Sequence, residues 1–366
     1  MQNVSIIGIG KLGLCTALCF ERAGISVLGI DVSESYVKSL NEKKYKTYEP
    51  LVEEYLISSK NFRASTSLEE GINFSDTIFI LVQTPNGGGD KFYDHSILSE
   101  LLSKINKLKP KNKTLVICCT VMPTYIDQIG KVLISDCEGC TLNYNPEFIA
   151  QGNIIKGFEN PDIVLIGESN KEAGDIIEHI HRKVVKNQPR VCRMSPVEAE
   201  ITKISINGFI TTKLAYANMV GDMCDMLHAD KQKVATAIGN DSRIGNKYFT
   251  PGYSYGGPCF PRDTKALSKI LRQVGVEPLI PDAVTQQNES HVIFQAEMLL
   301  KQNIDHTFEG MSYKGDNMPI IEESAKLKIA KYLVDEGKKV TIEGNSQMIE
   351  QIKKEYGNMF DYKLSI

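Results

Sequence analysis

The chain has 366 residues, of which 42% are hydrophobic and 24% are charged, and its formal net charge is -3. This length predicts two or three domains, because a single hydrophobic core rarely grows beyond about 250–300 residues. The composition is that of a soluble globular protein: it gives no reason to expect a membrane span or nucleic-acid binding. The nine scattered cysteines and the lack of a signal-peptide pattern predict a cytoplasmic protein with reduced thiols.

The N-terminal segment predicts a strand, a glycine turn, a helix and a second strand. An apolar run at residues 4–7 leads into Gly8-Ile9-Gly10-Lys11-Leu12-Gly13, a helical pattern follows to residue 23, and residues 26–30 form the next apolar run. In such a turn the first glycine permits a tight bend and the second lets the backbone approach a pyrophosphate. The third lets the helix pack against the sheet, and the N terminus of that helix favours phosphate.

Asp31 lies directly at the end of the second predicted strand. A carboxylate at this position binds a ribose 2'-hydroxyl and repels a 2'-phosphate, so the sequence favours NAD over NADP. The alternative interpretation is a purely structural glycine turn. The strand, the helix and Asp31 together favour dinucleotide binding.

Apolar runs at residues 77–82, 114–119 and 163–166 alternate with helical patterns. This order predicts an α/β fold whose N-terminal domain is a Rossmann-like, doubly wound parallel sheet. The strand ends Gln83-Thr84-Pro85 and Cys119-Thr120-Val121 should project over one cleft, because ligands bind beyond the carboxyl ends of parallel strands. Ordinary turn chemistry explains both segments equally well.

The second half predicts a long helix and a smaller α/β region. From Ser195-Pro196 an amphipathic pattern runs to about residue 228, which predicts a helix of roughly 50 Å that connects domains and supports a dimer. A loop rich in glycine, tyrosine and proline follows at 243–261, then a helical pattern at 264–274. From about residue 304 the order is strand, helix, strand, helix. We therefore predict domains at 1–190, 191–290 and 291–366.

A cysteine lies just before the predicted helix that follows this loop, in Gly256-Gly257-Pro258-Cys259-Phe260-Pro261-Arg262-Asp263. The helix dipole and Arg262 would favour a nucleophilic thiolate, whereas a buried inert thiol is the alternative. Lys203 and Asn207 lie four residues apart on one face of the long helix. Two interpretations are open: a solvated pair on the surface, or a pair with a role in a functional site. The surrounding isoleucines and the position of an asparagine inside a helix favour the second interpretation.

Two further features are less informative taken alone. Glu147, in Asn145-Pro146-Glu147-Phe148, reads as a surface carboxylate. Cys137 and Cys140 have the spacing of a metal or redox pair, but the chain has no second pair of this kind. We interpret them as incidental thiols and predict no metal site.

Together, these motifs resemble the UDP-glucose/GDP-mannose dehydrogenase family, with the UDP-glucose 6-dehydrogenase branch as the nearest pattern. The matching runs occur in the family's order between residues 8 and 267: GIGKLG with IDVSES, VQTP, CTV, NPEF followed by QG, EAEITKISINGF, and NDSRIG to SYGGPCFPRDTKAL. Several motifs in sequence are far more specific than one glycine turn. The resemblance implies a nucleotide-sugar-binding role for residues 291–366.

The resemblance implies that the C6 alcohol of a nucleotide sugar is oxidised to a carboxylate with two NAD per turnover. Cys259 would capture the intermediate aldehyde as a thiohemiacetal and then become a thioester. Lys203 and Asn207 would stabilise the oxyanion, and Asp263 would orient Lys203 or the hydrolytic water. Thr120 would hold that water, and Glu147 would lie near the nicotinamide and the sugar.

The resemblance also implies two sets of binding residues. The cofactor would be bound by Gly8, Gly10, Lys11, Leu12, Gly13, Asp31, Thr84, Thr120, Glu147 and Arg262. The substrate, a UDP-sugar or a GDP-sugar, would be bound by Phe148, Lys203, Asn207, Arg243, Tyr248, Tyr255, Gly256 and Lys314. Within that set, Arg243 would reach the substrate across the interface of a homodimer.

Departures from the family pattern leave the sugar and the base open. Ile149-Ala150-Gln151-Gly152 stands where the family has LREG, and the segment after Lys314, GDNMPIIEES, lacks the family's arginine. Thr124 and Tyr125 replace a common glycine and threonine. UDP-glucose is the first expectation; UDP-galactose, an N-acetylated UDP-hexose and GDP-mannose are alternatives. A single-step hydroxyacid dehydrogenase, which would not need Cys259, and a non-catalytic sensor of NAD or nucleotide sugar are the remaining rivals.

Overall fold

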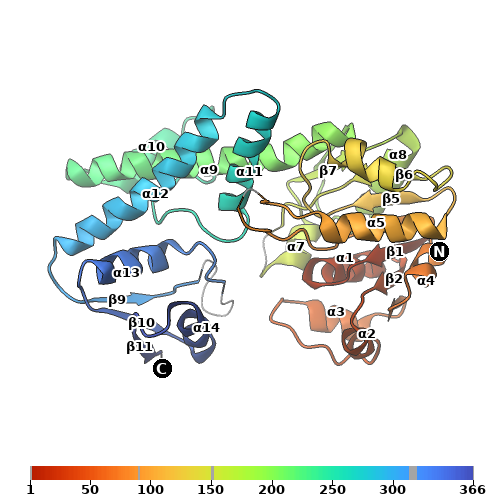
Figure 1. Cartoon of the computed structure of the whole chain (residues 1–366), viewed down its shortest axis with the longest axis horizontal. Coiled ribbons are helices and arrows are strands. Elements are labelled where there is room, and N and C mark those ends of the chain that lie inside the picture. Colours follow the sequence, from red (N-terminus) through yellow and green to blue (C-terminus); the bar gives the residue numbers. More distant parts are fainter. Residues whose placement is uncertain (1, 90, 150–151, 313–319, 366) are drawn as a thin grey trace. The chain divides into compact units, whose positions relative to one another are not determined.

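The structure, a computed structural model, describes residues 2–89, 91–149, 152–312 and 320–365 (Figure 1). The chain forms two compact units, Met1–Lys203 and Ile204–Ile366. Helix α9 (Pro196–Met226) begins in the first unit and ends in the second. Its bounds agree with the long helix that the sequence predicts.

The first unit is built on an eight-stranded sheet in the order β3-β2-β1-β4-β5-β6-β7-β8. From β1 the strand order proceeds outward in both directions, which is the doubly wound arrangement expected from the sequence. The strands are short, and most apolar residues of β1, β2, β4, β5, β6 and β7 are buried, because helices cover both faces of such a sheet. They are β1 (Asn3–Ile7), β2 (Ser26–Ile30), β3 (Phe62–Ser65), β4 (Thr77–Ile80), β5 (Thr114–Ile117), β6 (Thr141–Tyr144), β7 (Ile163–Gly167) and β8 (Arg190–Met194).

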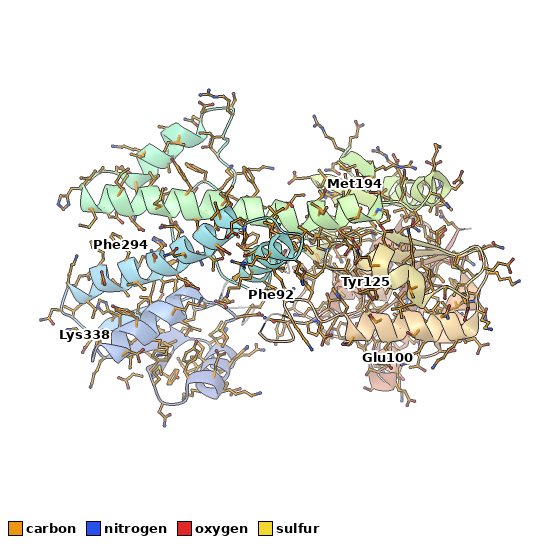
Figure 2. All side chains as sticks on the ribbon, turned by 45° about the horizontal axis from the view of Figure 1, so that its top comes forward. Phe92, Glu100, Tyr125, Met194, Phe294 and Lys338 are labelled. Atoms are coloured by element: carbon orange, nitrogen blue, oxygen red, sulfur yellow. The ribbon has the colours of Figure 1, made fainter. Side chains whose placement is uncertain are left out.

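Two apolar clusters fill the space between this sheet and its helices. One contains Phe20, Phe79 and Phe158, whose rings meet edge to face at 5.0 and 5.7 Å; the other contains Leu98 and Tyr144. The helices are α1 (Lys11–Arg22), α2 (Glu34–Asn41), α3 (Val52–Ser58), α4 (Leu68–Phe74), α5 (Ser96–Leu108), the π-helix η1 (Ile126–Gly130), α6 (Lys131–Leu133), α7 (Ile154–Glu159) and α8 (Lys171–Val184). Figure 2 labels Glu100 on α5 and Tyr125 before η1.

The direction of β7 differs from the prediction of a wholly parallel sheet. β6 pairs with β7 in antiparallel fashion, through Tyr144 and Gly167, whereas β7 and β8 are parallel to each other. In the described part of the connecting segment, the only helix is the six-residue α7, which packs against α1. Two neighbouring parallel strands need a connection that returns the chain to the end of the sheet where the first strand begins. Here β7 begins at the other end, so it runs antiparallel to β6.

The second unit contains the rest of α9, three more helices and a small α/β layer. Its sheet is parallel in the order β11-β10-β9. No strand was predicted for the segment that forms β11, a strand of only four residues of which three are exposed. The elements are α10 (Lys231–Gly239), α11 (Phe260–Gln273), α12 (Leu279–Leu300), β9 (His306–Glu309), α13 (Ala325–Asp335), β10 (Val340–Gly344), α14 (Ser346–Tyr356) and β11 (Asp361–Leu364).

The start of α11 corrects a second expectation. The helix begins at Phe260, four residues before the predicted start, and Pro261 lies in its first turn. Proline is well tolerated there because the first helical amides have no acceptor within the helix. Arg262 and Asp263 therefore lie in the first turn of the helix that follows Cys259.

The boundaries of the units do not coincide with the predicted domain boundaries. Strand β8 begins at Arg190 and extends the sheet beyond the first predicted boundary. The three-way division at residues 190 and 290 stays a prediction. Within the described part of the chain, no helix combines the length and the apolar composition required to cross a bilayer.

Candidate functional site

The glycine turn after β1 brings backbone, strand and helix into close contact. Gly8 has φ +90°, and a Cβ atom there would lie 2.8 Å from the carbonyl oxygen of Leu81. A Cβ atom on Gly13 would lie 2.0 Å from the carbonyl oxygen of Gly8, so α1 packs directly on the turn. Gly10 is the N-cap of α1, and no described side chain caps this helix. Its first amides can therefore donate to a phosphate.

A pocket of about 650 Å³ lies beside this turn, at the carboxyl ends of β1, β2 and β4. Gly8, Gly10 and Asp31 line it on one side, and Ile97 and Leu101 of α5 line it on another. The Asp31 carboxylate accepts a hydrogen bond from the backbone amide of Ser33 at 3.1 Å. Backbone donors, a carboxylate and apolar side chains in one pocket fit the phosphates, a ribose and the base of a dinucleotide.

Lys11 and Leu12 open helix α1 directly after the turn. Lys11 is exposed and Leu12 is half-buried. The ends of β4 and β5 come together as the sequence predicts: the Thr84 hydroxyl donates to the carbonyl oxygen of Thr120 at 2.9 Å. This bond fixes the backbone of Thr120 beyond the carboxyl end of β5.

Beyond β6, the side chain of Lys203 contacts the segment that contains Glu147 and Phe148. The Lys203 Nζ donates to the backbone oxygen of Glu147 at 2.5 Å and lies 4.4 Å from the centre of the Phe148 ring. Lys203 is buried. Burial raises the pKa of the Glu147 carboxyl to about 7, and the charge of Lys203 opposes that rise. Glu147 therefore changes its charge near neutral pH.

In the second unit, Cys259 is the N-cap of α11. All nine cysteines lie in the described residues, and only Cys259 is exposed. One turn further on, Asp263 donates its backbone amide to the carbonyl oxygen of Cys259 at 2.8 Å. The buried Asp263 carboxylate accepts a hydrogen bond from Asn207 Nδ2 at 2.5 Å. The first turn of α11 is thus joined to α9 directly beside the exposed thiol.

The residues before Cys259 form a loop without regular secondary structure. Tyr255 and Gly256 are buried, whereas Tyr248 is half exposed and has φ +59°. The centre of the Tyr248 ring lies 6.2 Å from that of Phe260. Arg243 is exposed, and its guanidinium pairs with Asp241 at 2.7 Å. Lys314 lies outside the described residues.

Comparison with known proteins assigns the family. Residues 2–185 match the UDP-glucose/GDP-mannose dehydrogenase family's NAD binding domain, and residues 197–290 match its central domain. The chain belongs to this family. The expectation drawn from the sequence motifs is therefore confirmed at the level of family, fold and the cofactor NAD.

Relatives in this family differ in their named substrates. The UDP-glucose 6-dehydrogenase of Rickettsia bellii is 28% identical over 92% of this chain and 79% of its own length. The GDP-mannose 6-dehydrogenase of Pseudomonas aeruginosa is 27% identical over 93% and 80%, respectively. Among solved structures, a UDP-glucose dehydrogenase from Pyrobaculum islandicum superposes with a TM-score of 0.89 at 28% identity, covering 99% of this chain and 86% of that one.

The predicted site residues fall into two groups, one in each unit. The first unit holds the glycine turn, Asp31, Thr84 and Thr120, and Glu147, Phe148 and Lys203; the second holds Asn207, Arg243, Tyr248, Tyr255, Gly256, Cys259, Arg262 and Asp263. Their catalytic and binding roles stay predictions. Sequence reasoning missed Asn218 and Asn288, whose side chains bind the loop before Cys259. An asparagine inside a helix was the available signal, as it was for Asn207.

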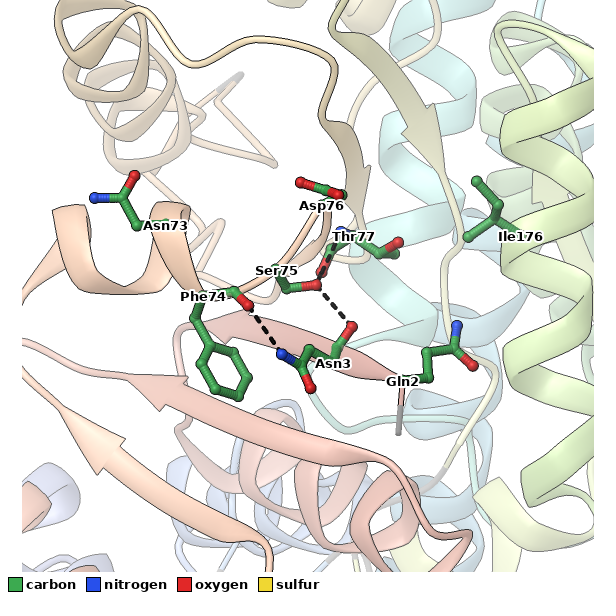
Figure 3. Close-up of a pocket in the computed structure, with 8 residues that line it drawn as sticks. All are labelled: Gln2, Asn3, Asn73, Phe74, Ser75, Asp76, Thr77 and Ile176. Atoms are coloured by element: carbon green, nitrogen blue, oxygen red, sulfur yellow. Dashed lines mark hydrogen bonds between the residues drawn. The ribbon is translucent and has the colours of Figure 1, made fainter.

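A second hollow of about 500 Å³ lies at the amino ends of β1 and β4 (Figure 3). Hydrogen bonds join several of its lining residues: Asn3 Nδ2 donates to the carbonyl oxygen of Phe74 at 3.3 Å, and the Ser75 hydroxyl donates to that of Asn3 at 2.7 Å. Ligands of open α/β sheets bind at the other end of the strands. We assign no function to this hollow.

The described residues also contain no group of three His, Cys, Asp or Glu side chains that could hold a metal ion.

Proposed function

We propose that this chain oxidises a nucleotide sugar, UDP-glucose in the first instance, to the corresponding uronate with two NAD per turnover. The observation that carries the proposal is the exposed Cys259 at the entrance of α11, one turn from the hydrogen-bonded pair of Asp263 and Asn207. A cysteine at this position is accessible to an electrophile and has the helix amides behind it. The other eight cysteines are buried or partly buried.

NAD, when bound at the glycine turn, supplies a hydride acceptor for each of the two oxidations. Cys259 adds to the aldehyde carbon, so a C–S bond forms and the aldehyde oxygen takes up a proton in the thiohemiacetal. The second oxidation yields a thioester at the same carbon. Water then breaks the C–S bond, which releases the carboxylate and restores the thiol. The covalent bond keeps the aldehyde from leaving between the two oxidations.

The remaining residues have roles that follow from their charges and hydrogen bonds. Lys203 is a buried cation that can stabilise negative charge on the substrate oxygen, and Asn207 is a donor held in place by Asp263. Thr120 is held through its carbonyl by Thr84 and is proposed to bind the hydrolytic water. Glu147 is the proposed acceptor of a proton, because its pKa of about 7 allows it to exchange protons near neutrality.

The experiment is a substrate panel followed by the absorbance of NADH. UDP-glucose, UDP-galactose, UDP-N-acetylglucosamine and GDP-mannose are each incubated with NAD, and the NADH formed per sugar consumed is counted. We expect two equivalents with one member of the panel. One equivalent would instead support a single-step dehydrogenase, and NAD binding without reduction of NAD by any sugar would support a sensor.

The same assay tests the nucleophile. Cys259→Ser should abolish formation of the uronate, because an alkoxide of serine is not available near neutral pH, while NAD affinity stays within about twofold. Cys192→Ser, which changes a partly buried thiol of β8, is the matched control and should retain turnover. Production of the acid by Cys259→Ser at the wild-type rate would refute the assignment.

A further inference from the structure

The loop that leads to Cys259 is held by side chains instead of by a neighbouring strand. Gly252 and Tyr255 have no place in a helix or sheet, yet each has both its N–H and its C=O group bonded to side chains of α9 or α12. Tyr255 is buried, and backbone groups that leave water need such partners, whereas Gly252 is exposed. The two helices therefore determine the path of this loop.

Asn288 of α12 makes three hydrogen bonds to this loop, two of them through its side chain. Its Oδ1 accepts from the Tyr255 amide at 2.9 Å, and its Nδ2 donates to the Tyr255 carbonyl oxygen at 3.0 Å. One side chain thus pairs with both backbone groups of one residue, as a β-strand partner would. The Ser254 hydroxyl donates to the backbone oxygen of Asn288 at 2.7 Å. Asn288 is buried, so these bonds are shielded from water.

Gly252 is held in the same way from two helices. Asn218 of α9, which is buried, accepts from the Gly252 amide through Oδ1 at 2.9 Å and donates to the Tyr253 carbonyl oxygen at 3.3 Å. His291 of α12 bonds to the Gly252 carbonyl oxygen through Nε2 at 2.8 Å. Its Nδ1 lies 2.8 Å from the Asp222 carboxylate, which orients the ring.

Close contacts also hold the backbone between this loop and Cys259. Gly256 packs so closely on the backbone of Glu323 that a Cβ atom would lie 2.2 Å from its carbonyl oxygen. The Gly257 amide donates to the carbonyl oxygen of Glu322 at 3.0 Å. Only Pro258 separates that bond from Cys259, the N-cap of α11.

We propose that Asn288 and Asn218 are positioning residues that hold the loop at residues 252–255 and thereby place Cys259 and the substrate-binding backbone of Tyr255 and Gly256. The functional part of this inference rests on the proposed function. The side chains of both asparagines bind the loop backbone, and they act through it. The loop is ready to receive the nucleotide sugar because its ordering cost is met during folding.

The test compares two variants of Asn288 with the wild-type chain in the presence of NAD. Asn288→Leu removes both bonds to Tyr255, whereas Asn288→Asp keeps the acceptor and removes only the donor. Gln286→Leu, at an exposed position of the same helix, is the matched control. Hydrogen exchange of the peptide at 250–258 is measured by mass spectrometry, and kcat and KM are measured for the nucleotide sugar that the panel identifies.

We expect the loop to exchange about thirtyfold faster in Asn288→Leu, since two hydrogen bonds are lost and each net bond corresponds to about a fivefold change, and less strongly in Asn288→Asp, which loses one. The kcat/KM for the nucleotide sugar should fall about ten- to a hundredfold, with NAD affinity within about twofold. A general loss of stability would instead weaken NAD binding together with turnover of the nucleotide sugar. If Asn288→Leu fails to fold, Asn288→Asp and Asn218→Leu give the same readouts.

Wild-type exchange in the loop of the variants would overturn the proposal. Faster exchange with unchanged kcat and KM would overturn the positioning role. If the wild-type chain turned over no nucleotide sugar, the proposed function would fail by itself. In that case the exchange rates would still decide whether the asparagines hold the loop.

Discussion

Glu147 shows how burial can prepare one side chain for proton transfer. The Nζ atom of the buried Lys203 binds the backbone carbonyl oxygen of Glu147. Loss of solvation outweighs the attraction of the nearby ammonium, so the pKa of the carboxyl rises from 4.5 to about 7. A group with this pKa can accept a proton in slightly alkaline solution and release it again at little cost.

The pH profile of turnover tests this role. Below about pH 7 Glu147 is protonated and cannot accept a proton, so kcat should rise with pH through that value and then level off. Glu147→Gln should lower kcat about a hundredfold or more and remove that rise. Glu54→Gln, at an exposed position of α3, should keep the wild-type profile. An unchanged rise near pH 7 in Glu147→Gln would assign the titration to another group.

At the scale of elements, the start of α9 holds the turn that precedes η1. The Glu200 carboxylate accepts from the backbone amides of Thr124 at 2.7 Å and Ile126 at 2.9 Å. Thr124 has φ +78°, an unusual conformation for a β-branched residue, and these bonds help to keep it. This is the turn at which the sequence departs from the family pattern.

Glu200 also links this contact to the pH dependence of stability. Burial raises the pKa of Glu200 from 4.5 to about 7. The folded state therefore binds its proton more tightly than the unfolded state, and this contribution to stability is lost as pH rises from about 4.5 to 7. A glutamine side chain does not titrate. Glu200→Gln should therefore reduce the loss of unfolding free energy over this pH range by about 3 kcal/mol, at about 1.4 kcal/mol per pKa unit.

Urea unfolding at pH 5 and pH 8 measures this difference. Glu297→Gln, which changes an exposed carboxyl group of α12, should leave the decline at its wild-type size. If Glu200→Gln lost as much stability between the two pH values as the wild type, Glu200 would not be the titrating group.

At the scale of the whole molecule, α9 carries an apolar stripe that suits the predicted homodimer. The stripe repeats at spacings of three, four and seven residues, as in a helix that packs against another helix. Its members are each between 43% and 67% exposed in the single chain: Phe209, Tyr216, Met219, Met223 and Met226. Large apolar side chains exposed in a row mark an interaction surface. A second copy of this chain is the partner that the sequence predicts.

Light scattering after size exclusion tests the homodimer. The wild-type chain should elute as a dimer, and Met223→Glu should elute as a monomer, because a carboxylate in the stripe would have to lose its hydration. Turnover of Met223→Glu should fall because dimerisation is lost, since Arg243 is predicted to reach the substrate of the other copy. Val132→Glu, at an exposed apolar position of α6, is the control. A monomeric wild-type chain with full activity would contradict both expectations.

The sequence by itself determined the features that depend on neighbouring residues. The glycine turn, Asp31 after β2, the length of α9 and the cysteine at the entrance of a helix all follow from apolar periodicity and turn chemistry, which act over a few residues. These features, with the order of the motifs, were enough to predict the family and NAD. They were not enough to predict β11 or the early start of α11.

Tertiary structure alone decided the features that join distant parts of the chain. The antiparallel entry of β7 depends on where α7 packs, and the pKa of Glu147 depends on how much solvent its surroundings remove. The path of the loop before Cys259 depends on Asn218 and Asn288, which lie 34 and 33 residues away from the groups they bind. Such contacts form only when the chain folds, because no local pattern specifies which distant side chain will satisfy a given backbone group.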